Sequence, residues 1–152
     1  MDAIWILRLY EYAMDEGHYA PQESERIFVV IRQMIHMGIM KRQVDRDNKT
    51  FVESIKVWFR VAEINGHPAG FLLNAEREPG SQEIEVYQMG TRQQFMRRGV
   101  AQALLDDTLS TYAGRPFFAR CYPRSNEAVS LLVKKGFKVS HITPKGTREL
   151  KR

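Results

Sequence analysis

Residues 96–101, Met96-Arg97-Arg98-Gly99-Val100-Ala101, have the composition of an anion-binding helix start. Apolar residues follow at helical spacing, at Leu104, Leu105 and Leu109, so a helix begins near the glycine. The first turn of a helix offers unpaired backbone N–H groups and the positive end of the helix dipole. The glycine and the alanine leave those groups uncovered, and the two arginines add positive charge. The segment therefore predicts a pyrophosphate cradle, and a surface helix with an ordinary basic N-terminus is the alternative.

The composition of the chain is that of a moderately basic globular protein. It has 152 residues and 43% apolar content, which fit one domain spanning residues 1–152. The formal net charge of +5 suits a phosphorylated ligand, but there is no long Lys/Arg run, so we expect no nucleic-acid partner. No apolar run reaches membrane-spanning length and the N-terminus has no signal-peptide pattern, so we expect no membrane association.

The single cysteine and the four histidines suggest no further chemistry. Cys121 cannot form a disulfide within the chain, which is compatible with the reducing cytoplasm, and we expect it to be a buried thiol in a strand. The histidines show no spacing such as His-x-x-x-His, so we expect no metal site. We expect Trp5 and Trp58 in the core, with the wall of an acceptor site as the alternative.

The N-terminal part of the chain is predicted to be helical. Residues 4–17 form an amphipathic pattern ending at Gly17, although a first strand over residues 4–7 is the alternative. Residues 21–38 begin with Pro21, which suits the first position of a helix, and carry an apolar stripe. Residues 40–56 are polar and mixed in charge, which predicts a loop with at most one helical turn. Residues 40–51 of this loop could cover an acceptor site.

A hairpin is predicted next along the chain. The β-rich residues 57–64 and 69–73 flank Asn65-Gly66, which is a strong hairpin signal. Gly70 lies inside the second run, where glycine indicates a bulge or a close backbone contact.

Strands and helices then alternate. Residues 83–89 form the next predicted strand, with Ile84 and Val86 on one face and Glu85, Tyr87 and Met89 on the other. The remaining predicted elements are a helix between Gly99 and Gly114, a strand at residues 116–122, a helix between Ser125 and Gly136, and strands at residues 137–143 and 147–151. This order predicts an α/β (α+β) domain in which helices flank a mixed, mostly antiparallel central sheet.

Two motifs in this order resemble those of the GNAT superfamily of N-acetyltransferases. The helix-start motif of the family is Gln/Arg-x-x-Gly-x-Gly/Ala, and Met96 replaces its first, polar residue. The second family pattern is Asn-x-x-Ala-x-x-Leu-Tyr-x-x-x-Gly-Phe. Aligned on Gly136-Phe137, it places Ser125 at the Asn position and Leu132 at the Tyr position, with Asn126 one residue late. The likeness extends over residues 57–143.

The resemblance implies a single GNAT-like domain that binds acetyl-CoA. It implies that the pyrophosphate binds the helix start, at Arg97, Arg98, Gly99, Val100, Ala101 and Gln102. It implies that the pantetheine pairs with the end of the preceding strand as an added strand would, at Met89, Gly90 and Thr91. Ser125 or Asn126 would bond the pantetheine, and a plain helix cap is the equal alternative for these two residues.

The reaction implied is direct attack of an amine on the acetyl thioester. Glu85 is the candidate general base, because its position matches a catalytic glutamate of some family members. The alternative is that Glu85 is an exposed strand residue in a structural salt bridge. Glu83 is the second candidate for the base. Leu132 replaces the usual acid tyrosine. Tyr122 is therefore the candidate acid, with Tyr87 or water as alternatives. Water suffices as a proton donor because a thiol has a pKa of about 8.5, so the leaving thiolate has little need of a protein acid.

The sequence thus predicts a cytoplasmic N-acetyltransferase for an amine acceptor, either a small molecule or a protein. Glu76, Glu78, Glu83 and Glu85 hint at an acidic patch for a cationic acceptor. A catalytically silent CoA-binding regulatory module is the main alternative, and a homodimer is possible.

Overall fold

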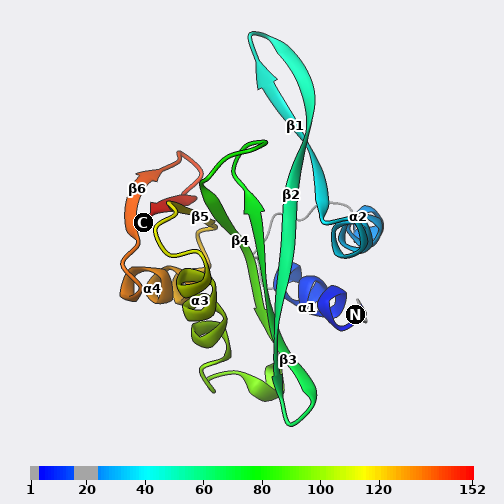
Figure 1. Ribbon diagram of the computed structural model, residues 1–152, viewed down its shortest axis with the longest axis vertical. Coiled ribbons are helices and arrows are strands. Elements are labelled where there is room, and N and C mark those ends of the chain that lie inside the picture. The colour runs from blue at the N-terminus through cyan, green and yellow to red at the C-terminus, as the bar shows by residue number, and fades with distance from the viewer. Residues whose placement is uncertain (1–3, 16–23) are drawn as a thin grey trace.

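The computed structural model describes residues 4–15 and 24–152 (Figure 1). Within these residues seven strands form one sheet in the order β1-β2-β3-β4-β5-β7-β6. Neighbouring strands are antiparallel except for β4 and β5, so the predicted mixed, mostly antiparallel sheet is confirmed. The strands are β1 (Ile39–Arg46), β2 (Lys49–Ile64), β3 (His67–Glu76), β4 (Ile84–Thr91), β5 (Phe117–Cys121), β6 (Lys138–Ile142) and β7 (Arg148–Lys151).

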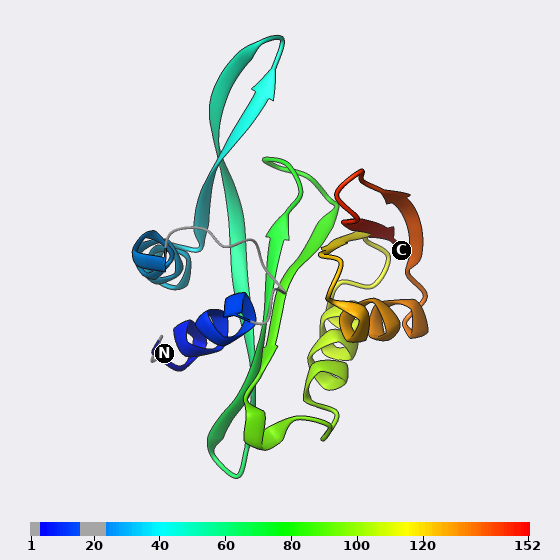
Figure 2. The same cartoon turned by 180° about the vertical axis from the view of Figure 1, so that it is seen from behind.

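Helices cover both faces of the sheet (Figure 2). α1 (Ile4–Asp15) and α2 (Ser24–Met37) lie on one face, and α3 (Val100–Thr111) and α4 (Asn126–Lys134) lie on the other. All four predicted helices are therefore confirmed, while Gly17 and Pro21, proposed as boundary residues, lie outside the described residues. None of the described helices has both the length and the apolarity needed to cross a bilayer.

Each face of the sheet has its own hydrophobic core. Leu72, Ile84 and Val86 pack with residues of α3 and α4, whereas Phe71, Leu73 and Ala75 pack with residues of α1 and α2. This alternation along β3 follows from the period of two in a strand that is buried on both faces. We refer to the two sides as the α3/α4 face and the α1/α2 face.

The prediction of a loop at residues 40–56 is wrong, because these residues form the hairpin of β1 and β2. Met40 and Ile55 are opposite each other and buried, but the side chains between them along the hairpin are exposed or half-buried on both faces. This outer part of the hairpin therefore shows no apolar alternation in the sequence. Asp47 and Asn48 have positive φ values of 53° and 58°, which a tight hairpin turn of this hand requires.

The hairpin predicted at Asn65-Gly66 is confirmed between β2 and β3, with both φ values positive. The close contact predicted at Gly70 is also present. A Cβ atom there would lie 2.7 Å from the Gly90 carbonyl oxygen and 2.7 Å from a Val100 methyl group. The missing side chain lets β3 approach both the end of β4 and the first turn of α3.

A β-bulge in β4 changes which face its residues occupy. Ala75 is opposite Glu85 and Asn74 is opposite Val86, but Leu73 is opposite Gln88, so Tyr87 has no partner on β3. Met89 consequently packs on the α3/α4 face while Tyr87 packs on the α1/α2 face. The prediction that Met89 shares a face with Glu85 and Tyr87 is therefore wrong, because one extra residue shifts the alternation.

β4 and β5 separate soon after they meet. In the described chain they pair from Ile84 opposite Phe117 to Val86 opposite Ala119 and no further. The later residues of β4 and the end of β5 thus face a space that no strand of the described residues fills. This divergence positions the site described next.

Candidate functional site

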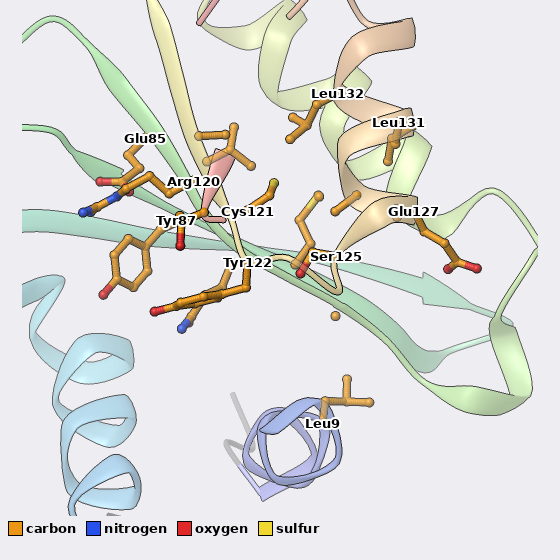
Figure 3. Close-up of a pocket in the computed structure, with 18 of the residues that line it drawn as sticks. Leu9, Glu85, Tyr87, Arg120, Cys121, Tyr122, Ser125, Glu127, Leu131 and Leu132 are labelled. Atoms are coloured by element: carbon orange, nitrogen blue, oxygen red, sulfur yellow. The ribbon is translucent and has the colours of Figure 1, made fainter. Parts of the chain in front are cut away.

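The described residues line an open cavity of about 1430 Å³ where β4 and β5 diverge. Its wall includes residues of the cradle segment, of β4 and β5, and of α1, α2 and β1. Figure 3 shows Glu85, Tyr87 and Arg120 on one side of this space, Glu127 and Leu131 on the other, and Leu9 of α1 across from them. The predicted site residues that line the cavity are Glu85, Tyr122, Met89, Gly90, Thr91, Arg97, Gly99, Val100, Ala101, Gln102 and Ser125.

α3 begins where the cradle was predicted. Gly99 is its N-cap residue, with φ 77°, and its carbonyl accepts the first helical hydrogen bond from the Ala103 N–H at 2.9 Å. A Cβ atom at Gly99 would meet no protein atom within 4 Å, so glycine is needed for the left-handed backbone and for open access, not for packing. Val100, 6% exposed, is the core residue of this turn, while Ala101 is half-buried and lines the cavity.

The two arginines of the cradle segment diverge. Arg97 has φ 58° and lines the cavity, which places its charge beside the helix start. Arg98 does not line it, and its guanidinium lies 5.6 Å from the centre of the Phe95 ring. The structure therefore places one of the two predicted arginine contacts at the cavity.

Glu85 is a buried carboxylate in an ion pair. It is 2% exposed; its Oε1 accepts a hydrogen bond from Arg120 Nε at 3.0 Å and lies 2.9 Å from Arg120 Nη2 in a salt bridge. Its Oε2 is buried and has no hydrogen-bond partner among the described residues. Burial raises the pKa of Glu85 above its usual value, and the positive charges of Arg120, Arg42 and Arg77 oppose this rise. The alternative prediction was that Glu85 is an exposed residue in a structural salt bridge. The salt bridge is present, but the side chain is buried and not exposed.

Two tyrosines lie beside this ion pair. Tyr122, 38% exposed, lines the cavity between the Glu85 group and Ser125 (Figure 3). Burial and the Glu85 charge raise the pKa of Tyr87, which also lines the cavity. Leu132, at the position of the family's tyrosine, is 1% exposed in the core of the α3/α4 face, although part of it reaches the cavity wall.

The N-terminus of α4 separates the two remaining cofactor candidates. Ser125 is the N-cap residue and lines the cavity, but in the described chain its side chain makes no capping hydrogen bond. Asn126 does not line the cavity, and its Oδ1 accepts a hydrogen bond from Arg148 at 3.0 Å. Arg148 also donates to the carbonyls of Tyr122 and Pro123, so β7 holds the loop that carries Tyr122 and Ser125.

The suggested acidic patch does not form. Glu76 is buried and accepts hydrogen bonds from the backbone N–H groups of Lys56 and Gly80. Glu83, the fallback base, is paired with Arg77 at 2.7 Å and lies outside the cavity wall. With Glu85 bound to Arg120, these carboxylates are engaged by cations or main chain instead of facing solvent together.

Sequence reasoning missed the contributions of β1 and of the residue after the bulge. Met40, Lys41 and Arg42 line the cavity, and the turn residues Asp47-Asn48 were the signal that could have revealed their strand. Gln88 also lines the cavity, but the bulge that turns it there has no signal in the sequence.

The remaining predictions concern residues without assigned chemistry. Cys121 is buried as expected, and burial raises the pKa of its thiol to about 11. Trp5 packs against Phe71 and Trp58 packs beside Tyr112, so both are partly buried core residues, as expected. No cluster of three or more metal-ligating side chains occurs in residues 4–15 and 24–152.

Comparisons with known proteins identify the fold. No family model and no curated protein matches the sequence. Among solved structures, a ribosomal-protein-alanine N-acetyltransferase from Brucella melitensis matches with a TM-score of 0.68 at 13% identity, over 99% of this chain and 93% of that one. The PaiA N-acetyltransferase from Thermoplasma acidophilum in complex with coenzyme A matches with a TM-score of 0.61 at 12% identity, over 96% and 86%.

The GNAT domain of PAT from S. lividans matches with a TM-score of 0.56 at 21% identity. The match covers 63% of this chain and 60% of that one. These likenesses show that the chain has the fold of the GNAT acetyltransferases. The fold predicted from the two motifs is therefore confirmed.

Proposed function

We propose that the protein is an acetyl-CoA-dependent N-acetyltransferase that acts on an amine acceptor. The observation that carries the proposal is that one cavity connects an uncovered helix start, at Gly99, with a buried carboxylate, Glu85. These are the two groups that the transfer needs, an anion cradle and a proton acceptor. The likeness to proteins named as N-acetyltransferases, one of them a coenzyme A complex, supports the same activity.

The residues at the helix start fit the cofactor. The N–H groups at the start of α3 would hold the pyrophosphate, with Arg97 beside them. The main chain of residues 89–91, which has no β5 partner in the described chain, would pair with the pantetheine amides. Acetyl-CoA supplies the activated acetyl thioester.

Glu85 would take a proton from the acceptor amine. A primary amine has a reference pKa of about 10.4 and must lose a proton before it can attack. Glu85 Oε2 is available for that proton, and Arg120 holds the carboxylate through its other oxygen. The nearby guanidiniums also disfavour the ammonium form of a bound amine. Tyr122, which lines the same cavity, is the proposed proton donor to the leaving thiolate, and water is the alternative donor.

Two measurements test the proposal together. Calorimetric titration with acetyl-CoA should give binding heat, and a thiol-release assay with a panel of amines should give acceptor-dependent release of CoA. No binding heat at millimolar acetyl-CoA would refute the cradle. Binding without thiol release from any amine would instead indicate the silent CoA-binding module, which the buried Leu132 at the usual acid position favours.

A further inference from the structure

Two buried oxygen atoms without hydrogen-bond partners among the described residues belong to residues that line the cavity. One is Glu85 Oε2 and the other is Gln88 Oε1; both are buried, and neither accepts a hydrogen bond from a described residue. A buried acceptor without a donor costs roughly 1–3 kcal/mol. Two such atoms on the wall of one cavity therefore indicate a ligand that brings hydrogen-bond donors.

The bulge at Tyr87 makes these two residues neighbours on one face. Glu85 is opposite Ala75 and Gln88 is opposite Leu73, and both partners belong to the core of the α1/α2 face. Residues directly opposite each other in an antiparallel pair point to the same face. Because the two partners are two residues apart on β3, the Cα atoms of Glu85 and Gln88 lie about 7 Å apart along β4. Their side chains can therefore both reach one small group.

We propose that the acceptor is an apolar primary monoamine whose nitrogen binds between Glu85 and Gln88. A neutral primary amine has two N–H donors, one for each oxygen, and keeps its lone pair for attack. Gln88 thus becomes an acceptor-binding residue for the proposed reaction, on which this inference rests.

The surroundings of these oxygens define the rest of the acceptor. Met34 and Val30 of α2 and Met40 of β1 form an apolar wall on this side of the cavity. Lys41 and Arg42 line the same cavity, where Arg42 is ion-paired with Glu53 at 3.4 Å, and Arg120 lies beside Glu85 (Figure 3). Arg120 is ion-paired with Glu85 and also interacts electrostatically with Glu149, whereas Glu127 lies on the other side of the cavity (Figure 3). A second cationic group on the acceptor would meet Lys41 and Arg42, whereas a hydrocarbon body fits the apolar wall.

The test compares three acceptors with the intact protein and saturating acetyl-CoA: phenethylamine, N-methylphenethylamine and spermidine. We expect kcat/KM for phenethylamine to exceed that for either of the others by about tenfold or more, because the N-methyl amine lacks one donor and spermidine carries extra charges. Acetylation of spermidine in preference to phenethylamine would overturn the inference but leave the proposed function intact. No thiol release from any amine would refute the proposed function, and the inference with it.

Variants at one position then isolate Gln88. Gln88→Leu removes the oxygen at similar size, and the preference for phenethylamine over its N-methyl analogue should fall about tenfold while the KM for acetyl-CoA stays unchanged. Gln88→Glu keeps an acceptor oxygen and should retain the preference. Gln43→Leu makes the same chemical change at an exposed residue outside the cavity wall and should have no effect.

An unchanged preference in Gln88→Leu would overturn the role of Gln88. If that variant does not fold, as judged by circular dichroism, Gln88→Met provides the same comparison with a flexible side chain. A loss of preference in both Gln88→Leu and Gln88→Glu would equally contradict the inference, because it would show that shape and not hydrogen bonding sets the selectivity.

Discussion

At the scale of single residues, the Glu85–Arg120 pair combines a structural and a chemical role. One carboxylate oxygen contacts two guanidinium nitrogens, and the other is buried without a hydrogen-bond partner among the described residues. From the sequence alone, the salt bridge and the general base were competing interpretations of Glu85. The geometry makes them compatible, since an ion pair through one oxygen keeps the carboxylate ionised while the other oxygen stays available.

Glu85→Gln should lower kcat by about 100-fold or more, since general-base catalysis typically contributes that much. The amide keeps the size of the side chain, so the affinity for acetyl-CoA should not change. Steady-state kinetics of thiol release and a calorimetric titration check the two halves of this expectation. Glu83→Gln is the matched control, because Glu83 pairs with Arg77 outside the cavity wall. An unchanged rate in Glu85→Gln would remove Glu85 from the base role.

Arg120→Met should shift the acidic limb of the pH–rate profile to higher pH. Burial already raises the pKa of Glu85, and the variant removes the largest opposing charge. A carboxyl whose folded pKa lies above its unfolded value stabilises the fold most below the unfolded pKa and loses that contribution as pH rises through the folded pKa. The variant should therefore be less stable than the wild type at pH 7, by about 2 kcal/mol, and approach it at pH 4. Urea unfolding at both pH values measures this, and an equal deficit at both would contradict it.

Gly99→Glu should abolish binding of acetyl-CoA. A carboxylate at the N-cap would lie against the pyrophosphate, and the left-handed backbone at φ 77° adds strain to any side chain there. Calorimetry measures the affinity. Gly80→Glu provides the control, because Gly80 has φ 76°, similar open space and a position outside the cavity wall. Equal loss of affinity in both variants would indicate general destabilisation instead of a cradle.

At the scale of secondary-structure elements, glycine contacts set the distance between the sheet and α3. Gly70→Ala should destabilise the protein by about 2 kcal/mol, because its Cβ would overlap the Gly90 carbonyl oxygen and the Val100 side chain. It should also weaken acetyl-CoA binding, since Val100 begins α3. Denaturant unfolding and calorimetry measure the two effects. Gly80→Ala, with open space, should cost about 1 kcal/mol from backbone strain alone and leave binding unchanged.

The elements also show which parts of the fold sequence reasoning could reach. Strands and helices with buried faces were found because burial leaves a pattern of apolar residues, periodic in α3 and continuous in β3, which is buried on both faces. The outer part of the β1–β2 hairpin was missed because it has no buried face. The helix start at Gly99 was predicted from backbone chemistry. The face of the sheet on which Gln88 lies was not predicted, because a bulge depends on the partner strand and leaves no mark in local composition.

At the scale of the whole molecule, acetyl-CoA should stabilise the fold. A ligand that binds only the folded state at about 100 times its Kd adds about 2.7 kcal/mol. For a chain of this size that corresponds to a rise in Tm of roughly 5–10 °C, measurable by differential scanning fluorimetry. Gly99→Glu should show no rise. A similar rise with DNA and none with acetyl-CoA would instead support a nucleic-acid-binding protein.

The unpaired residue in β4 also constrains how this strand can change over generations. Substitutions along it leave each position on its own side, so its amino acids can be replaced widely while the fold persists. Deletion of the single unpaired residue, Tyr87, would give a regular ladder in which the residues on either side keep their partners on β3, so a related strand without the bulge would be one residue shorter here. Comparison of this strand with that of a distant relative must therefore place a gap correctly before any residue in it can be matched.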